Sequence, residues 1–329
     1  MWDSVQRIIR TYDSFLLTSH VNPDGDAIGS EMALKAFLED LDKQVVVANA
    51  SRTPDPLVFL DPAGEIQHCP SGVSRELLED IDAIFVLDLN NFDQLGGVAS
   101  SVQHSPLPRV CIDHHVEPSE DFASVVVSDT SAAATGILVY ELILSMGGKI
   151  RKAIADALYA TIITDTGTFR FSNTDPRALR AAANLCELGA NPFSLHRQVF
   201  GNKTWATGRL MGPVLATVQS AADGRLAWIS ASLEMLRAAG ATYDDTEGFA
   251  DLVRAIKDVE LVLFFKETSD GHIKVSLRSN GRVDAYAIAR HFGGGGHRMA
   301  SGTRVDGPLD AAVRRVVDVC LQVDGIRPE

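Results

Sequence analysis

Residues 16–30 read LLTSHVNPDGDAIGS, so a short apolar run leads into a histidine and two aspartates. The run has the length of a buried β-strand, and the following AIGSEMALKAFLEDL has the apolar spacing of a helix. His20, Asp24 and Asp26 are therefore expected in the turn between a strand and a helix. A D-x-D pair in a turn is by itself more often solvated than bound to metal, so the rest of the chain decides its meaning.

The first half of the chain alternates short apolar runs with helical patterns of ten to fifteen residues. Short buried strands between such helices predict an α/β fold, with a mostly parallel sheet and helices on both faces. The expected strands lie at 15–19, 43–50, 82–90, 109–115 and 124–129. The expected helices lie at 1–13, 27–41, 131–146, 152–164 and 178–189.

The stretch GANPFSLHRQVFGNKTWATG breaks this rhythm, and we expect the domain boundary there. Beyond it, VELVLFFKE and HIKVSLRSN are joined by TSDG, which predicts a hairpin in a smaller α/β domain with a mixed sheet. A helix is expected over 210–222. The predicted organisation is a first domain at 1–190, a linker at 191–208 and a second domain at 209–329, with an active-site cleft between the domains.

Composition limits the possible partners and compartments. The 329 residues carry a net charge of −13, which argues against coating a long nucleic-acid duplex. The stretch 271–304 is an exception, because six basic residues and one acid give it a net charge of +5. The four cysteines are far apart in sequence, and no apolar segment could span a bilayer or serve as a signal peptide. We therefore expect reduced thiols, a cytoplasmic protein and no membrane partner.

Three further segments carry acids or histidines at the ends of expected elements. Asp88 ends AIFVLD, Asp113, His114 and His115 end RVCIDHH, and Asp165 follows the helix YATIIT. Ligands of open α/β sheets bind beyond the C-terminal ends of the strands, so these side chains are expected to meet the first cluster. Taken singly, each has a structural reading, as a helix cap, a turn or a satisfied histidine pair.

The ordered set of four segments is harder to explain structurally. Histidine mixed with carboxylate suits Mn²⁺, Zn²⁺ or Fe²⁺ better than Ca²⁺ or Mg²⁺. A carboxylate that bridges two such ions forms the clamp used in phosphoryl hydrolysis. The set therefore predicts a hydrolytic site with two metal ions.

HVNPDGDAIGS, VLD, DHH and TDTGTFRFSN resemble the four successive motifs of the DHH phosphoesterases, and GGGGHRMASG resembles the glycine-rich signature of their DHH-associated C-terminal domain. The resemblance covers nearly the whole chain. It is greatest to the stand-alone bacterial members that act as nanoRNases and as phosphatases of 3′-phosphoadenosine 5′-phosphate (pAp). One position departs from the family pattern, because Asn91 stands where a second acid is common. We interpret this as variation around the metal site.

The resemblance implies a role for each motif residue. One ion, most simply Mn²⁺, would be held by His20 and Asp24, a second by Asp26, His114 and Asp165, and Asp88 would bridge them. His115 would face the scissile phosphate or orient a ligand, Asp113 would hold a histidine ring, and Arg170 would contact a phosphate. Gly25 is expected to let the backbone turn tightly, so that Asp24 and Asp26 face different ions. Phe169 and Phe171 are expected in the core rather than as base-stacking platforms.

The run GGGG before His297 is, taken alone, more often a flexible loop than a binding site. Its N–H groups can also form an anion-binding nest, and its basic surroundings favour that reading. By resemblance, the distal nucleotide of the substrate would be held by Arg278, Ser279, Asn280, Gly294, Gly295, Gly296, His297 and Arg298.

The implied activity is Mn²⁺-dependent hydrolysis of short RNA or DNA oligonucleotides and dinucleotides to mononucleotides, and removal of phosphate from pAp. One alternative keeps the chemistry but acts on cyclic-di-AMP or linear dinucleotides. Another, of a different class, is a catalytically inactive nucleotide-binding regulator, although all the ligand positions are present. An inorganic pyrophosphatase is disfavoured by GGGGH. A homodimer is possible.

Overall fold

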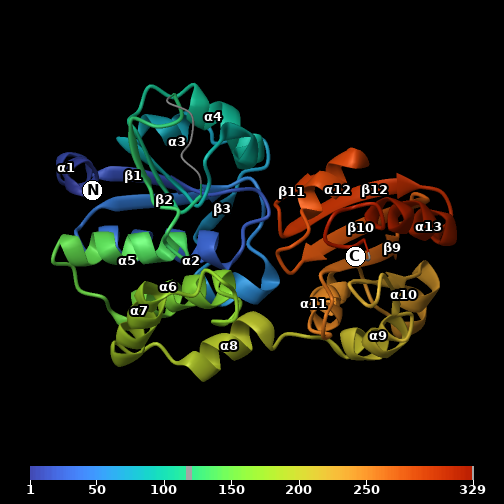
Figure 1. Cartoon of the computed structure of the whole chain (residues 1–329). Coiled ribbons are helices and arrows are strands. Elements are labelled where there is room, and N and C mark those ends of the chain that lie inside the picture. Colours follow the sequence, from blue (N-terminus) through green and yellow to red (C-terminus); the bar gives the residue numbers. More distant parts are fainter. Residues whose placement is uncertain (116–120, 328–329) are drawn as a thin grey trace. The chain divides into compact units, whose positions relative to one another are not determined.

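The computed structural model describes residues 1–115 and 121–327, and the chain divides into two compact units, Met1–Asn202 and Lys203–Glu329 (Figure 1). In the first unit, the described residues form a six-stranded sheet in the order β3-β2-β1-β4-β5-β6, with every pair parallel. The strands are β1 (Ser14–Thr18), β2 (Gln44–Asn49), β3 (Ile66–His68), β4 (Ala83–Leu87), β5 (Arg109–Asp113) and β6 (Val125–Ser128). The prediction of a mostly parallel sheet is confirmed.

Helices cover both faces of this sheet. The central strands therefore carry apolar side chains on both faces. Phe15 and Leu17 pack into one core and Leu16 into a second core on the opposite face. Figure 1 shows α2 and α5 on one face of the sheet and α3 and α4 on the other. The helices are α1 (Asp3–Thr11), α2 (Gly25–Glu39), α3 (Arg75–Glu79), α4 (Ala99–Gln103), α5 (Thr135–Ser145), α6 (Lys152–Asp165), α7 (Pro176–Glu187) and α8 (Pro192–Phe200), with 3₁₀ turns η1 (Asp55–Leu60) and η2 (Phe92–Val98).

Helices α2 and α6 approach each other through small residues. A Cβ added to Gly25 would lie 2.3 Å from the Thr164 Cγ2 atom, and one added to Gly29 would lie 2.7 Å from the Ala157 carbonyl oxygen. Gly25 begins α2, and its backbone is not in the left-handed region. The expectation that Gly25 serves a tight backbone turn is therefore wrong. Glycine is needed there because α6, which ends at Asp165, packs directly against the start of α2.

The stretch 191–208, expected to be a linker, contains regular structure. Helix α8 begins after Asn191, whose side chain accepts a hydrogen bond from the Ser194 N–H group. Leu195 and Val199 of this helix pack into the core of the first unit. Half of the stretch is therefore a helix packed on the first unit, and its last residues already belong to α9 (Trp205–Leu215).

The second unit has a mixed sheet, as predicted. Its described strands follow the order β11-β12-β10-β9-β8-β7, and β8 and β9 are parallel whereas the other pairs are antiparallel. The strands are β7 (Gln219–Ala221), β8 (Leu226–Ala231), β9 (Leu261–Glu267), β10 (His272–Ser279), β11 (Gly295–Gly296) and β12 (Ala300–Asp306). The helices are α9 (Trp205–Leu215), α10 (Leu233–Ala239), α11 (Phe249–Arg254), α12 (Ala285–His291) and α13 (Leu309–Cys320), with a 3₁₀ turn η3 (Asp244–Thr246). The helix expected over 210–222 ends at Leu215, because residues 219–221 pair with β8 instead.

The two faces of this second sheet differ. On one face, Val275 and Leu277 of β10 pack with α12 and α13 in an apolar core. On the other, the core formed with α9, α10 and α11 includes residues of β8 and β9, among them Phe264. The β10 residues of that face are Lys274, Ser276 and Arg278, so the sheet presents polar side chains where the apolar core ends.

Two further expectations concern the whole chain. The four cysteines are free thiols, as expected. Within residues 1–115 and 121–327, no helix has both the length and the apolar character needed to cross a bilayer.

Candidate metal centre and substrate-binding residues

Five elements of the first unit deliver acidic or histidine side chains to one place. His20 follows β1, Asp88 follows β4 and His114 follows β5, and these three strands are neighbours in the sheet. Asp26 lies in the first turn of α2, and Asp165 is the last residue of α6. The structure brings the four motif segments together at the C-terminal edge of the sheet, where α/β proteins bind their ligands.

Asp88 lies between two histidines. Its Oδ2 atom is 3.5 Å from the His20 Nε2 atom, and its Oδ1 atom is 3.6 Å from the His114 Nε2 atom. The Thr135 hydroxyl donates a hydrogen bond to Oδ1 over 3.0 Å. The backbone of Asp88 is left-handed, with φ of 61°, an uncommon conformation for a non-glycine residue. Each oxygen of this buried carboxyl thus faces a different histidine.

His20, Asp24 and Asp88 form the first potential metal-binding group. Their possible ligand atoms all lie within 4.8 Å of one another. The His20 Nδ1–H donates to the Val21 carbonyl over 3.0 Å, in the tautomer that leaves Nε2 as the acceptor toward the carboxylates. Asp24 also caps α2, because its Oδ1 atom accepts from the N–H groups of Asp26 and Ala27.

Asp26, His114 and Asp165 form the second potential metal-binding group. The His114 Nε2 atom is 3.2 Å from Asp165 Oδ2 and 3.8 Å from Asp26 Oδ2. The His114 Nδ1–H donates to the Ala132 carbonyl over 3.2 Å, which again leaves Nε2 to face the acids. The two groups match the two ligand sets implied by the resemblance, with Asp88 next to both.

The start of α5 holds Asp26 in place. The buried carboxylate accepts hydrogen bonds from the N–H groups of Thr135 over 2.6 Å and Gly136 over 2.9 Å. The partial positive charge of a helix N-terminus favours a carboxylate at this position. Thr135 therefore contacts both Asp26 and Asp88, a role that sequence reasoning missed. The available signal was a threonine at the start of an expected helix, in SAAATGILV.

The carboxyls are crowded and largely out of water. Burial, followed by the charges of the neighbouring aspartates, raises the pKa of Asp88 and of Asp165 well above the usual range. Burial is also the largest cause of the raised pKa of Asp26, although His114 acts in the opposite direction. Such a set is costly to ionise on its own, and histidine nitrogens with carboxylate oxygens are donors that divalent transition metals prefer. The residues present therefore fit a divalent metal ion.

Asp113 and His115 form a hydrogen-bonded pair beside this cluster. The His115 Nδ1–H donates to the buried Asp113 carboxylate over 2.8 Å, and this hydrogen bond is the main reason that the pKa of His115 is raised. The expected contact between Asp113 and a histidine ring is present in the structure. His115 also lies within a third group of possible ligand atoms, with Asp88 and His114.

The turn after Asp165 has an unusual backbone. Gly167, Thr168 and Phe169 are consecutive left-handed residues, with φ of 54°, 60° and 61°. Arg170 is exposed, and its Nε–H donates to the Gly167 carbonyl over 2.7 Å. Phe169 packs against the core as expected, but the expectation that Phe171 is a core residue is wrong. Its side chain is 41% exposed and lies against Gly167.

Asn91, which replaces the second acid of the family pattern, holds the loop after β4. Its side chain caps η2 by accepting from the Gln94 N–H group, and it donates to the Gln94 Oε1 atom over 2.8 Å. The substitution of amide for acid therefore supports the backbone next to Asp88.

The expected substrate residues of the second unit divide into two kinds. Arg278 lines a cavity, and His297 and Arg298 are exposed. Ser279 is buried and donates to the Val283 carbonyl over 2.6 Å, and the Asn280 amide donates to the Val259 carbonyl over 2.7 Å. The structure uses these last two side chains to hold the turn after β10, which differs from the substrate contact that we expected.

The glycine run is an ordered sheet edge. Gly295 and Gly296 form β11 and pair with β12. A Cβ on Gly294 would lie 2.3 Å from the Gly302 carbonyl oxygen, and Gly296 has φ of 129° and a similarly close backbone neighbour. An added Cβ on Gly295 would meet nothing within 4 Å. The close approach of β12 explains why glycine is needed at positions 294 and 296. It does not explain the glycine at position 295.

The comparisons with known proteins agree with this geometry. Residues 14–162 match the DHH family, N-terminal domain, and residues 229–322 match the DHHA1 domain. A Thermus thermophilus protein named bifunctional oligoribonuclease and PAP phosphatase NrnA is 34% identical over 309 residues, which cover 92% of this chain and 87% of the relative. The chain belongs to the DHH family. A Bacillus subtilis DHH-family relative of the same name is 30% identical over 306 residues, with 91% of each chain covered.

Solved structures give the same result for the DHH fold. An exopolyphosphatase-related protein from Bacteroides fragilis superposes with a TM-score of 0.91 at 32% identity, covering 97% of this chain and 95% of that one. The exonuclease RecJ bound to manganese has a TM-score of 0.52 at 15% identity, over 96% of this chain and 92% of that chain, which supports the fold alone. The resemblance inferred from the sequence motifs is confirmed.

Proposed function

We propose that this DHH-family protein hydrolyses short oligoribonucleotides to mononucleotides and removes phosphate from pAp. The observation that carries the proposal is the position of Asp88, whose two oxygens face His20 and His114 in two adjoining groups of possible metal ligands. The names of the relatives in Thermus thermophilus and Bacillus subtilis support the choice of substrates.

The proposed cofactor is a pair of divalent ions, with Mn²⁺ as the expected metal. Asp88 would bridge them, while His20 and Asp24 would hold one and Asp26, His114 and Asp165 the other. Such ions lower the pKa of bound water and neutralise charge on the attacked phosphate. The chain itself supplies orientation, because hydrogen bonds to backbone carbonyls fix both imidazoles and the start of α5 fixes Asp26.

His115 is proposed to contact the scissile phosphate. Asp113 fixes its ring and favours the protonated imidazole, which donates hydrogen bonds to phosphate oxygens. Arg170 is proposed to contact a phosphate from the same side of the sheet edge. In that case its guanidinium would keep the Gly167 contact through Nε and use its terminal nitrogens for the phosphate.

The second unit is proposed to hold the distal nucleotide. Arg278, His297, Arg298 and the open backbone at Gly295 remain candidates for this contact. Ser279 and Asn280 would contribute indirectly, by fixing the turn that follows Arg278.

Three further expectations from the sequence stay predictions. They are the exclusion of long duplexes, the homodimer and the cytoplasmic location. The net charge of −13 supports the first of them, because long nucleic acid is drawn mainly by basic surfaces.

A panel of substrates tests the proposal. The dinucleotides pApA and pGpG, pAp and cyclic-di-AMP are each incubated with the protein after chelation and again after Mn²⁺ is restored. We expect metal-dependent release of mononucleotides from the dinucleotides and of phosphate from pAp. Preference for cyclic-di-AMP would favour a cyclic-dinucleotide phosphodiesterase, and tight binding without turnover would favour an inactive regulator. Full activity after exhaustive chelation would contradict the metal assignment.

A further inference from the structure

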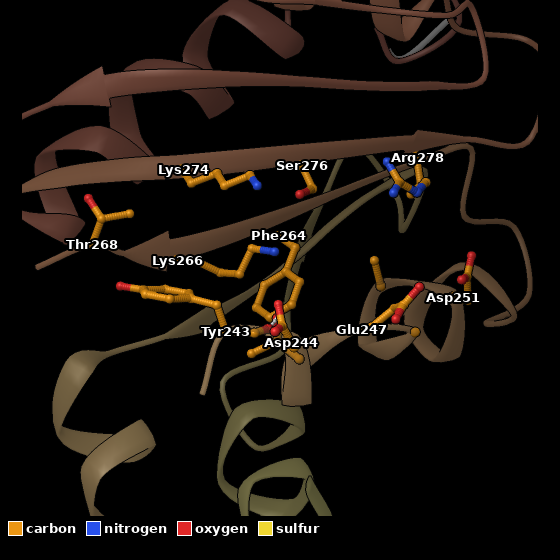
Figure 2. A pocket seen from close by; sticks show the side chains of 13 residues that line it. Tyr243, Asp244, Glu247, Asp251, Phe264, Lys266, Thr268, Lys274, Ser276 and Arg278 are labelled. Carbon is orange, nitrogen blue, oxygen red and sulfur yellow. Dashed lines mark hydrogen bonds between the residues drawn. The ribbon is translucent and has the colours of Figure 1, made fainter. Parts of the chain in front are cut away.

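The second unit contains a cavity of about 430 Å³ beside the polar part of its sheet (Figure 2). One wall consists of strands β9 and β10 and carries the cationic side chains of Lys266, Lys274 and Arg278. The facing wall comes from η3, α11 and the residues between them, and it carries the acidic side chains of Asp244, Glu247 and Asp251. Figure 2 shows Arg278 toward one end of the cavity and the two lysines toward the other. The cationic side chains therefore lie at separate positions along one wall of the cavity.

The positions of the lysines follow from the strand register. Lys266 and Lys274 are direct partners in the antiparallel pair of β9 and β10. Like charges at such positions destabilise a sheet, so this pair is a cost that the fold itself does not explain. Arg278 lies four residues beyond Lys274 on the same face, which places the two Cα atoms about 13 Å apart. One small ion could not contact both ends of this wall, so the spacing favours a ligand that carries more than one phosphate.

The surroundings of Lys266 point to an anion. Its side chain is partly buried, and its Nζ atom lies 5.0 Å from the centre of the Phe264 ring. Burial lowers the pKa of Lys266 to about 8, followed in importance by the charges of Lys274 and Arg278. Glu247 and Asp244 of the facing wall act in the opposite direction but more weakly. At Lys266, the repulsion by the two other cations of the wall therefore outweighs the attraction of the facing acids.

The neighbouring cation on the sheet gives a useful contrast. Arg304 of β12 is the partner of Lys274 on its other side, and it forms an ion pair with Asp270. Arg304 lies outside the residues that line the cavity. A cation adjacent to the lysines in the sheet is thus neutralised by an acid, and it serves as a matched control.

We propose that Lys266 and Lys274 bind a backbone phosphate one nucleotide beyond the one gripped at Arg278. The acids on the facing wall would direct that phosphate toward the strands. Oligomers of three or more nucleotides would make this contact, whereas dinucleotides and pAp would end before it. The cavity would therefore set the preference for substrate length, an inference that rests on the proposed function.

The decisive variant is Lys266→Gln combined with Lys274→Gln. For a trinucleotide, kcat/KM should fall about tenfold or more, because charge-assisted phosphate contacts are lost. The dinucleotide of the same base should lose far less. The slope of log kcat/KM against log salt should become shallower for the trinucleotide only. Lys274→Arg should retain the preference for length, and Arg304→Gln should resemble the wild type.

Binding of fluorescent di- and trinucleotides in a chelator separates this proposal from the proposed activity. If the wild type binds the trinucleotide more tightly and the double variant loses that advantage, the cavity proposal stands even without turnover. Thermal unfolding shows whether the double variant is folded, and removal of the like-charge pair should leave its midpoint unchanged or higher. Equal losses on both lengths, or no loss on either, would overturn the proposal.

Discussion

The metal centre of the first unit and the basic face of the second are built in opposite ways. In the first, several motif side chains are held by supporting groups, such as the start of α5 for Asp26 or the Ala132 carbonyl for His114. In the second, the motif region includes side chains that serve the fold, and the cations lie on the polar face of the paired strands β9 and β10. Chemistry that needs buried acids requires fixed geometry, whereas phosphate grip needs only charge placed along a surface.

The largest effect is expected at the residue that joins the two ligand groups. Asp88→Ala should lower turnover by a factor on the order of 10³ or more and should disturb metal binding at both groups. Steady-state kinetics with metal analysis of the purified variant checks this. Asn91→Ala is the control in the same loop and should have a much smaller effect. Substantial activity in Asp88→Ala would remove the bridging role.

Removing nucleotide contacts of the second unit should weaken substrate capture without affecting the metal centre of the first unit. Arg278→Ala and His297→Ala should leave metal binding intact, while kcat/KM on pApA falls about ten- to a hundredfold. A generic aryl phosphodiester should lose far less, because it lacks the distal nucleotide. The informative quantity is the ratio of efficiencies on the two substrates. An unchanged ratio would mean that this part of the second unit is only structural.

Thr135 tests whether the hydrogen bonds behind the acids matter. Thr135→Val keeps the shape of the side chain and the N–H contact to Asp26, but removes the hydroxyl that donates to Asp88. Metal affinity should fall about tenfold or more, as it does when a ligand loses its supporting hydrogen bond. Isothermal titration with Mn²⁺ measures this. The companion Thr161→Val removes a hydroxyl bonded to the Leu158 carbonyl instead, and should bind Mn²⁺ normally.

Substitutions at two neighbouring glycines test whether glycine is needed there for packing of the sheet or for close approach of the substrate. Gly294→Ala should lower the free energy of unfolding by about 1–3 kcal/mol, because its Cβ would collide with the backbone of β12. Gly295→Ala should have the same free energy of unfolding as the wild type in a denaturant titration. It should nevertheless weaken the binding of dinucleotides. If Gly295→Ala binds pApA like the wild type, close backbone approach to the substrate is not the reason for glycine at that position.

The smallest expected effect is the change with pH in the stabilisation that Mn²⁺ gives to the protein. Because burial raises the pKa of Asp88 and Asp165, their contribution to stability falls as pH rises above their unfolded pKa. Bound metal should remove this penalty, so the gain in melting temperature on adding Mn²⁺ should increase from pH 5 to pH 8. A gain that is constant or decreases with pH would contradict the crowded-carboxylate account.

Much of this architecture could be predicted from the sequence. The parallel sheet and the meeting of His20, Asp88 and His114 follow from strand-ending motifs, since adjacent parallel strands end at one edge. Asp165 ends helix α6 instead, so this argument does not cover it. The role of Gly25 could not be predicted, because it depends on which helix packs against α2. Thr135 was missed for a similar reason: its partners are more than forty positions away in sequence.

In the second unit, sequence motifs were less informative about individual side chains. Ser279 and Asn280 belong to a recognisable motif, yet their hydrogen bonds close a turn. The pairing of Lys266 with Lys274 depends on the register of two strands. A hairpin signal indicates that two strands are adjacent, but the register decides which side chains face each other.

Mn²⁺ titration of the wild-type protein, followed by electron paramagnetic resonance, tests the central claim most directly. If Asp88 bridges two ions, binding should saturate at about two Mn²⁺ per chain, and the spectrum should change from that of isolated ions to that of an exchange-coupled pair as the second ion binds. Saturation at one ion, or two ions with the spectrum of isolated Mn²⁺, would contradict a carboxylate shared between the two groups.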